Sequence, residues 1–243
     1  MCNTEKISIR GVNFDNVSPT EALDMAVGMI EKKDRAYVVH TPNAEIVQLC
    51  VEKPEYYELI NSADMIIPDG SGVILASKIL GTPLKKGKVA GVDLGWNLIK
   101  AAAEKGYGLY MLGGKPGVAE KAAANLKEMY PSLKISGYAD GYFKDDEPVI
   151  EKINESGADI LFVALGVPKQ ELWMNKNRDK LKVRLMAGLG GSVDIYAGEA
   201  KRAPKIFIKL GLEWLYRLLR EPKRIGRMMK LPKFVFGTIF AKK

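Results

Sequence analysis

Residues 108–130 read GLYMLGGKPGVAEKAAANLKEMY, and this stretch decides the fold class. The apolar run at 108–112 predicts a buried strand, the glycines of 113–117 predict a tight turn, and the following alanine-rich segment predicts a helix. The same order of strand, turn and helix recurs along the chain before residue 200. Continuously apolar strands that alternate with helices are typical of a parallel sheet covered on both faces. The sequence therefore predicts an α/β, Rossmann-like fold with a largely parallel sheet.

The other elements expected from this pattern cover most of the first 190 residues. Further strands are predicted at residues 36–39, 64–67, 133–136, 159–165 and 183–187. Helices are predicted at residues 19–32, 44–62, 91–105, 117–130, 147–156 and 168–180. Four of the strands run into polar or glycine-rich turns, at 40–43, 68–72, 113–117 and 166–170. Ligands bind beyond the carboxyl ends of parallel strands, so these turns are predicted to converge on one cleft.

Composition excludes several classes of protein. The chain has 243 residues, of which 47% are hydrophobic and 27% charged, and this balance excludes wholesale disorder and fibrous repeats. The first ten residues have no apolar segment of a secretory signal, and no later stretch has the length of a spanning helix. Two cysteines, Cys2 and Cys50, do not make a disulfide framework, so a reducing cytoplasm is the expected compartment.

The charge is concentrated at one end of the chain. Residues 200–243 contain 13 Lys and Arg against only Glu213 and Glu221, a net charge of +11, whereas the rest of the chain carries −3. This asymmetry predicts a body at residues 1–198 and a basic appendage at residues 199–243. An appendage of this kind suits a polyanionic partner, such as a phosphorylated ligand, an acidic membrane surface or a nucleic acid. The strand and helix set before Gly198 is complete, so a chain cut there is expected to fold.

The turn at 113–117 is a candidate phosphate cradle. Gly113, Gly114 and Gly117 would let the backbone approach an anion, and the next helix would add N–H donors at its N-terminus. Its spacing matches neither the dinucleotide fingerprint nor the P-loop. The alternative is an ordinary tight turn without a ligand.

Asp69 is the candidate general base. It follows a strand and precedes Gly70-Ser-Gly72, which leave room for a substrate hydroxyl. The alternative role is an N-cap of the following helix, which Asp fills well. Thr41 and Asn43, after another strand, could orient a sugar or phosphate, or could simply start a turn.

Two further polar residues follow strands 159–165 and 183–187. Gln170 lies in the first turn of a helix and could bind a base, ribose or phosphate, although such a residue is often only solvated. Asp194 follows Gly190-Gly-Ser and suits ribose hydroxyls. Metal chemistry has little support, since His40 is the single histidine and no Asp-x-Asp pair occurs. We therefore expect neither a metal nor a cofactor.

The basic appendage has the pattern of an amphipathic helix. At about 100° per residue, Lys209, Glu213, Arg217 and Arg220 would share one face. Arg224 and Arg227 would extend this polar stripe, although Pro222 should kink or restart the helix. The opposite face would hold Phe207, Ile208, Leu212, Trp214, Leu215, Leu218 and Leu219. The pattern suits an anionic membrane interface, and docking of the apolar face on the body is the alternative.

Five motifs occur in one order along the body, together with the basic appendage. They are Thr41-Pro-Asn43, Pro68-Asp-Gly70, Leu112-Gly-Gly-Lys-Pro-Gly117, Gly166-Val-Pro-Lys-Gln-Glu171 and Gly190-Gly-Ser-Val-Asp194. Their combination closely resembles the WecG/TagA/CpsF family of glycosyltransferases. Within the family it comes nearest to the branch that makes the linkage unit of wall teichoic acid. The resemblance implies inverting, metal-independent transfer of N-acetylmannosamine from UDP-N-acetylmannosamine to the 4-hydroxyl of N-acetylglucosaminyl-diphospho-undecaprenol.

The resemblance also assigns roles to single residues. It implies that Asp69 is the base with Thr41 and Asn43 beside it, that Gln170 lines the donor pocket, and that Arg217, Arg224 and Arg227 grip the acceptor diphosphate. It further implies homo-oligomers and a peripheral location on the cytoplasmic face of the membrane.

Other functions stay open from the residues alone. The sugar could be that of UDP-N-acetylmannosaminuronic acid or UDP-glucose. A nicotinamide-dependent oxidoreductase is disfavoured by the glycine spacing. A nucleic-acid-binding protein is disfavoured because the aromatic residues of the appendage segregate from its basic stripe, so no nucleic-acid partner is expected.

Overall fold

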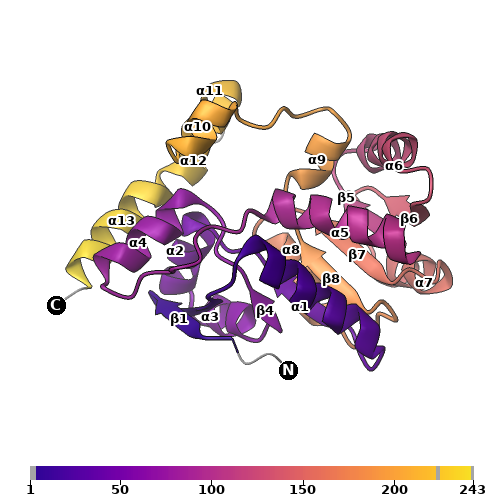
Figure 1. Cartoon of the computed structure of the whole chain (residues 1–243), viewed down its shortest axis with the longest axis horizontal. Helices are drawn as coiled ribbons and strands as arrows, with labels where there is room; N and C mark the ends of the chain where they lie inside the picture. Colours follow the sequence, from indigo (N-terminus) through magenta and orange to yellow (C-terminus); the bar gives the residue numbers. More distant parts are fainter. Residues whose placement is uncertain (1–3, 223–224, 242–243) are drawn as a thin grey trace. The chain divides into compact units, whose positions relative to one another are not determined.

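The computed structural model describes residues 4–222 and 225–241, and Cys2 lies outside the described residues. The chain packs as two units (Figure 1). The first unit combines Met1–Pro19, Thr41–Ala90 and Arg202–Lys243, and the second combines Thr20–His40 with Gly91–Lys201. Each unit is thus built from segments that are distant in the sequence. The division into a body and an appendage at residue 198 stays a prediction.

The second unit contains most of a parallel sheet. Its strands are β3 (Tyr37–His40), β5 (Gly108–Gly113), β6 (Lys134–Ala139), β7 (Ile160–Ala164) and β8 (Leu185–Gly188). With β4 (Met65–Ile66), they give a sheet in the order β4-β3-β8-β7-β5-β6. The β3–β8, β8–β7, β7–β5 and β5–β6 pairs are all parallel.

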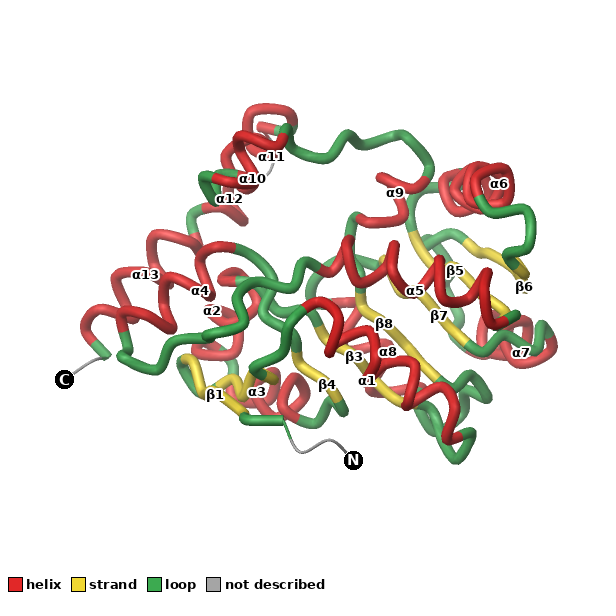
Figure 2. The backbone as a smooth tube through the Cα atoms, viewed as in Figure 1, coloured by secondary structure: helices red, strands yellow, loops and turns green. Residues whose placement is uncertain are grey.

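Helices cover this sheet on both faces (Figure 2). They are α1 (Pro19–Lys32), α5 (Gly91–Lys105), α6 (Val118–Met129), α7 (Glu147–Glu155), α8 (Lys169–Asn177) and the short α9 (Ser192–Tyr196). Figure 2 shows α1 and α5 in front of the strands and α8 behind them. The strands β5, β7 and β8 are almost entirely buried because both faces are covered. The α/β class predicted from the apolar runs is confirmed.

The first unit begins with a hairpin that the sequence analysis missed. Strands β1 (Lys6–Ile9) and β2 (Val12–Asp15) pair antiparallel around a two-residue turn. Arg10 and Gly11 both have left-handed φ angles, of 52° and 91°. Such turns match the twist of the two strands, although Asn-Gly or Asp-Gly is their usual sequence. The buried carboxylate of Asp15 accepts a hydrogen bond from the Ile66 N–H at 2.8 Å, which ties the hairpin to β4.

The rest of the first unit is helical. It consists of α2 (Ala44–Glu52), α3 (Pro54–Asn61), α4 (Ser71–Ile79), α10 (Lys205–Lys209), α11 (Glu213–Arg220), α12 (Ile225–Met228) and α13 (Lys230–Phe240). The single helix predicted over residues 44–62 is wrong, because Lys53 is extended before Pro54 and separates α2 from α3. A residue before proline is sterically pushed out of the helical region.

The appendage is not one continuous helix either. Gly211 adopts a left-handed φ of 71° and ends α10, with its N–H bonded to Ile208 and the Leu212 N–H bonded to Phe207. This is the glycine C-cap that commonly terminates helices. Lys209 therefore lies on a different helix from Glu213, and the predicted shared face is wrong for Lys209. The expected restart near Pro222 is confirmed, since α11 ends at Arg220 and α12 begins at Ile225.

The last helix, α13, packs against α2 and α4 (Figure 1). Phe234 and Thr238 are fully buried there. At the far end of α13 the Arg10 guanidinium donates to the Gly237 carbonyl at 2.6 Å. A chain cut after Gly198 would lose this packing, and whether such a chain still folds stays a prediction.

Candidate active site

The structure brings Thr41, Asn43 and Asp69 together within the first unit. The Asp69 N–H donates to the Pro42 carbonyl at 3.3 Å, which joins the turn after β3 to the turn after β4. A Cβ added at Gly70 would lie 3.7 Å from the Asn43 Cβ. Two of the four predicted turns therefore meet, as expected for neighbouring strand ends.

Asp69 does not occupy the N-cap of α4. The N-cap residue is Gly70, with a φ of 84° and no side-chain capping bond, and α4 begins at Ser71. The alternative role of Asp69 as N-cap is therefore wrong. Its half-buried carboxylate stands one residue before the cap, on a turn whose left-handed glycine brings no side chain of its own. This is a suitable position for a group that receives a proton from a hydroxyl.

Asn43 has a structural role that accounts for its position. Its side-chain oxygen accepts hydrogen bonds from the Glu45 and Ile46 N–H groups at 3.0 and 3.1 Å, and so caps α2. Asx residues are the preferred N-caps because they satisfy these otherwise unbonded donors. Thr41, two residues earlier, is half-buried. Because the side-chain oxygen of Asn43 caps α2, a contribution of Asn43 to substrate binding would have to come from its side-chain NH2 group.

A third segment borders the Asp69 turn and was not predicted from sequence. The Val89 N–H donates to the Pro68 carbonyl at 3.0 Å, so the connection between α4 and α5 runs along the strand end that carries Asp69. Its sequence, with lysines at 85, 86 and 88, looks like a solvated loop. Its place becomes clear from long-range contacts such as this backbone hydrogen bond.

The glycine turn at 113–117 lies in the second unit, where it contacts the end of β7. A Cβ at Gly113 would lie only 2.3 Å from the Ala164 carbonyl oxygen, and the Gly114 N–H donates to the same oxygen at 3.2 Å. Gly113 therefore has a packing reason to be glycine. Gly117 differs: it precedes α6 with a φ of 83°, and a Cβ there would meet nothing within 4 Å. Residues 115–117 before this 12-residue helix are exposed, and the Val118 N–H donates to the Lys115 carbonyl at 3.0 Å, so an anion would have to be bound by the other amides of the first turn.

Gln170 is buried and bonded inside the protein. Its side-chain oxygen accepts from the Gly190 N–H at 2.9 Å, and its amide nitrogen donates to Glu171 at 3.0 Å. Gln170 thus joins the start of α8 to the turn after β8. Asp194 is half-buried in the first turn of α9, beyond that same turn. The structure links the two predicted donor-side turns through Gln170.

A loop after β6 also lies beside the glycine turn. The Gly141 N–H donates to the Gly114 carbonyl at 3.0 Å, and Lys169 of α8 donates to the Gly141 carbonyl at 2.8 Å. These bonds leave Tyr142 with 69% of its surface exposed. The signal for this loop in the sequence is a glycine flanked by Asp140 and Tyr142 after a strand.

The four predicted turns therefore form two groups, one in each unit. The turns at 40–43 and 68–72 meet in the first unit, and those at 113–117 and 166–170 lie at adjacent strand ends in the second. The convergence of all four on one cleft stays a prediction.

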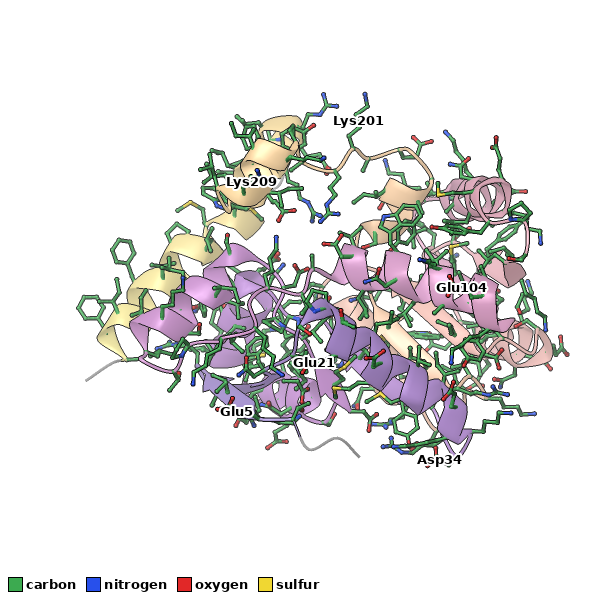
Figure 3. The ribbon with its side chains drawn as sticks, in the orientation of Figure 1. Glu5, Glu21, Asp34, Glu104, Lys201 and Lys209 are labelled. Carbon is green, nitrogen blue, oxygen red and sulfur yellow. The ribbon has the colours of Figure 1, made fainter. Side chains whose placement is uncertain are left out.

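The appendage exposes both charge and apolar surface. Arg217 and Arg220 are exposed in the last turn of α11; Arg224 and the side chain of Arg227 lie outside the described residues. Figure 3 shows charged and apolar side chains gathered around α10 and α11, Lys209 among them. Of the fifteen large apolar side chains exposed in the described residues, eight lie beyond residue 204: Ile206, Leu210, Leu219, Ile225, Met229, Phe236, Ile239 and Phe240. On α11, Leu219 is exposed and Trp214, Leu215 and Leu218 are partly buried, whereas α13 is docked through Phe234 and Thr238.

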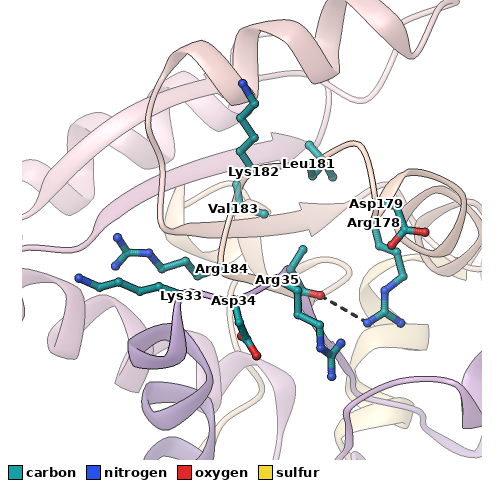
Figure 4. Close-up of a pocket in the computed structure, with 10 residues that line it drawn as sticks. Lys33, Asp34, Arg35, Arg178, Asp179, Leu181, Lys182, Val183 and Arg184 are labelled. Carbon is teal, nitrogen blue, oxygen red and sulfur yellow. Dashed lines mark hydrogen bonds between the residues drawn. The ribbon is translucent and has the colours of Figure 1, made fainter.

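A cavity of about 750 Å³ lies at the amino ends of β3 and β8, and no predicted site residue lines it (Figure 4). Its walls are basic, but the arginines already make structural contacts. Arg184 pairs with Asp159 at 3.1 Å, Arg178 donates to the Ala36 carbonyl at 3.4 Å, and Arg35 stacks on Tyr37. This edge of the sheet is opposite to the strand ends that carry the predicted site.

The described residues provide neither a cluster of metal ligands nor a membrane-spanning helix. Among them, no cluster of three or more His, Cys, Asp or Glu side chains is placed to hold a metal ion. None of the helices formed by these residues combines the length and apolarity that crossing a bilayer requires.

Comparison with known proteins decides the family. Residues 7–243 match the family model described as "Glycosyl transferase WecG/TagA/CpsF family". The chain belongs to this family. A protein of Bacillus spizizenii is 40% identical over 210 residues, covering 86% of this chain and 81% of the relative. A protein of Staphylococcus aureus strain MRSA252 is 36% identical over 245 residues, covering 99% of this chain and 95% of the relative.

Both relatives bear the same name, N-acetylglucosaminyldiphosphoundecaprenol N-acetyl-beta-D-mannosaminyltransferase. Membership of the WecG/TagA/CpsF family makes this chain a glycosyltransferase. The resemblance seen in the five motifs is confirmed, and the oxidoreductase and nucleic-acid-binding alternatives are left without support.

Proposed function

We propose that this enzyme transfers N-acetylmannosamine from UDP-N-acetylmannosamine to the 4-hydroxyl of N-acetylglucosaminyl-diphospho-undecaprenol. The observation that carries the proposal is the shared name of two relatives whose similarity covers 81–95% of their own length. The exposed helix N-terminus at Gly117 is consistent with binding of a UDP-sugar donor. The position of Asp69, outside the N-cap of α4, is consistent with deprotonation of an acceptor hydroxyl.

The reaction we propose is a single displacement with inversion. The acceptor 4-oxygen bonds to the anomeric carbon, the bond from that carbon to the UDP oxygen breaks, and the hydroxyl proton passes to Asp69. General bases in such positions typically contribute about 10²–10⁴-fold to the rate. Asp69 is suited to this role because Gly70 fills the N-cap position and leaves the carboxylate outside it.

The charge that develops on UDP needs stabilisation, and we propose that it comes from this chain without a metal. Amide groups at the start of α6 are the candidates on the donor side, whereas the guanidinium groups of Arg217 and Arg220 are assigned to the acceptor diphosphate. Guanidinium groups bind phosphate oxygens in bidentate fashion, and helix N-termini attract anions. Arg224 and Arg227, which were predicted from the sequence, are proposed to bind the acceptor diphosphate as well.

We further propose that the appendage binds the cytoplasmic face of the membrane. Eight exposed apolar side chains and a net charge of +11 occur in the same short segment. Apolar residues enter the interface, and each nearby basic residue adds about 1 kcal/mol on an anionic surface. An undecaprenyl chain stays in the bilayer, so this location would bring its diphosphate to the enzyme. Homo-oligomers remain an expectation, and sedimentation would measure the oligomeric state.

The test is product analysis with a panel of UDP-sugars and a short-chain lipid-diphosphate N-acetylglucosamine acceptor. We expect a disaccharide product with UDP-N-acetylmannosamine and at least tenfold slower turnover with UDP-glucose or UDP-N-acetylmannosaminuronic acid. Faster turnover with either of the other donors would overturn the proposed sugar. The absence of product with all donors would overturn the transfer itself.

A further inference from the structure

The appendage has an acidic residue on the helix face that carries two of its arginines. Among 13 basic residues it has two acidic ones, and Glu213 lies in α11 with Arg217 and Arg220. Residues four and seven positions after Glu213 lie within about 40° of it around a helix, so all three share one face. A carboxylate on a face that meets phosphates would weaken that interaction, so its presence calls for another partner.

Glu213 has such a partner in the first unit. Its carboxylate pairs with the ammonium group of Lys88, in the connection between α4 and α5. Each of the two side chains is only 22% exposed. Ion pairs that are partly shielded from water are screened less by salt than exposed pairs. Lys88 therefore holds the face of α11 that also carries the arginines.

A second contact fixes the turn just before α11. The Ser71 hydroxyl donates to the Gly211 carbonyl at 2.6 Å. The two residues are so close that a Cβ at Gly211 would lie 2.8 Å from the Ser71 Cβ. Gly211 also has a φ of 71°, so a larger residue there would meet both backbone strain and a clash.

The two contacts attach to both segments that border Asp69. Ser71 comes two residues after Asp69 and begins α4. Lys88 comes just before Val89, whose N–H donates to the Pro68 carbonyl at 3.0 Å. Gly211 in the turn before α11 and Glu213 at the start of α11 therefore contact the two segments that border Asp69.

We infer that Lys88–Glu213 and Ser71–Gly211 form a latch that positions α11, with its arginines, for use of the acceptor. Lys88, Glu213 and Ser71 are positioning residues: they act through Arg217 and Arg220 and not on the reacting atoms. The inference rests on the proposed function, because it takes the arginines as the acceptor-binding groups. In this inference the latch affects binding of the acceptor and does not affect binding of the donor.

The test exchanges the charges of the pair. The variants are Lys88→Glu, Glu213→Lys and the double exchange, assayed with a short-chain acceptor without vesicles, so that changes in membrane affinity do not enter. We expect each single variant to raise the acceptor KM at least tenfold and to leave the donor KM within twofold. The double exchange should return the acceptor KM to within threefold of the wild type.

A matched control exists in the same unit. Lys233 of α13 pairs with Glu52 of α2 at 2.6 Å, which ties the appendage to the body without touching α11. Lys233→Glu, Glu52→Lys and their exchange should leave the acceptor KM within twofold of the wild type. An equal effect of the control pair would overturn the latch, because any loosening of the appendage would then suffice.

Hydrogen–deuterium exchange separates the latch from the proposed function. In the single Lys88 and Glu213 variants, amides of residues 205–220 should exchange at least tenfold faster, and the double exchange should restore their protection. Unchanged protection in the single variants would overturn the latch even if transfer is confirmed. If the wild type transfers no sugar, the proposed function fails, and these protection data still decide whether the latch exists.

Discussion

Replacing Phe234 by alanine should destabilise the first unit strongly. Phe234 is fully buried on α13 where this helix packs against α2 and α4. Removing a buried phenylalanine ring costs about 3–5 kcal/mol, because the transfer free energy is lost and a cavity remains. A kcal/mol shifts the melting temperature of a chain of this size by about 2–4 °C, so the midpoint should fall by about 6–20 °C.

The assay is urea unfolding followed by circular dichroism, with hydrogen exchange to locate the loosened segment. Protection should fall in α2 and α4, since these helices lose the partner of their packed faces. Phe236 is the matched control on the same helix, because 62% of its surface is exposed. Phe236→Ala should change the free energy of unfolding by less than about 0.5 kcal/mol. A free energy of unfolding for Phe234→Ala within 1 kcal/mol of the wild-type value would refute the docking of α13.

Four other outcomes follow from the site and its surroundings. Asp69→Asn should lower turnover by about 10²–10⁴-fold with unchanged UDP affinity and stability, and near-normal turnover would exclude Asp69 as base. Arg217→Ala should raise the acceptor KM more than the donor KM, measured with the same short-chain acceptor; a larger donor effect would contradict its assigned role. EDTA should leave transfer intact, whereas a loss restored by magnesium or manganese would show that a metal takes part. Asp146→Ala should cost about 2–3 kcal/mol at pH 7 in urea unfolding, because Trp173 and Asn177 lose their acceptor.

The Asp146 interaction also predicts a pH dependence. Burial alone would raise the pKa of Asp146, but hydrogen bonds from Lys176, Asn177 and Trp173 together hold the pKa below its usual value. A lowered pKa in the folded state stabilises the protein above the unfolded pKa of about 3.9, and the contribution is lost as the pH falls through the folded value. Between pH 6 and pH 3 the wild type should therefore lose more unfolding free energy than Asp146→Asn does. Parallel curves for the two proteins would contradict this assignment.

The sheet could be predicted because its strands are continuously apolar and lie between amphipathic helices. Such patterns are local, and all six predicted strands differ from the observed ones by only a few residues at either end. Pro54 is also a local signal, but the apolar pattern of residues 44–62 continues across it and favours a single helix. The β1–β2 hairpin was missed because Arg10-Gly11 is an uncommon turn sequence and the strands are only four residues long.

Other features depend on partners far away in the chain and had no local signal. The capping role of Asn43 was not assigned from the sequence, and the assignment of the α4 N-cap to Gly70 required the backbone angles. The docking of α13 depends on a surface formed by α2 and α4, about 180 residues earlier in the chain. A pattern of apolar residues on a helix predicts that a face will be covered, and does not say whether lipid or protein covers it.

The hydrogen bond between Arg10 and Gly237 has a consequence for the order of folding during synthesis. All residues of the second unit have been polymerised once the ribosome has added Lys201, so its sheet can close early. The first unit must wait for α13, which is synthesised well after α2 and α4, before these two helices are covered and Arg10 finds its acceptor. The segments around Asp69 therefore receive their final packing only after α13 has been synthesised. Until then, α2 and α4 would expose apolar surface that a chaperone could recognise.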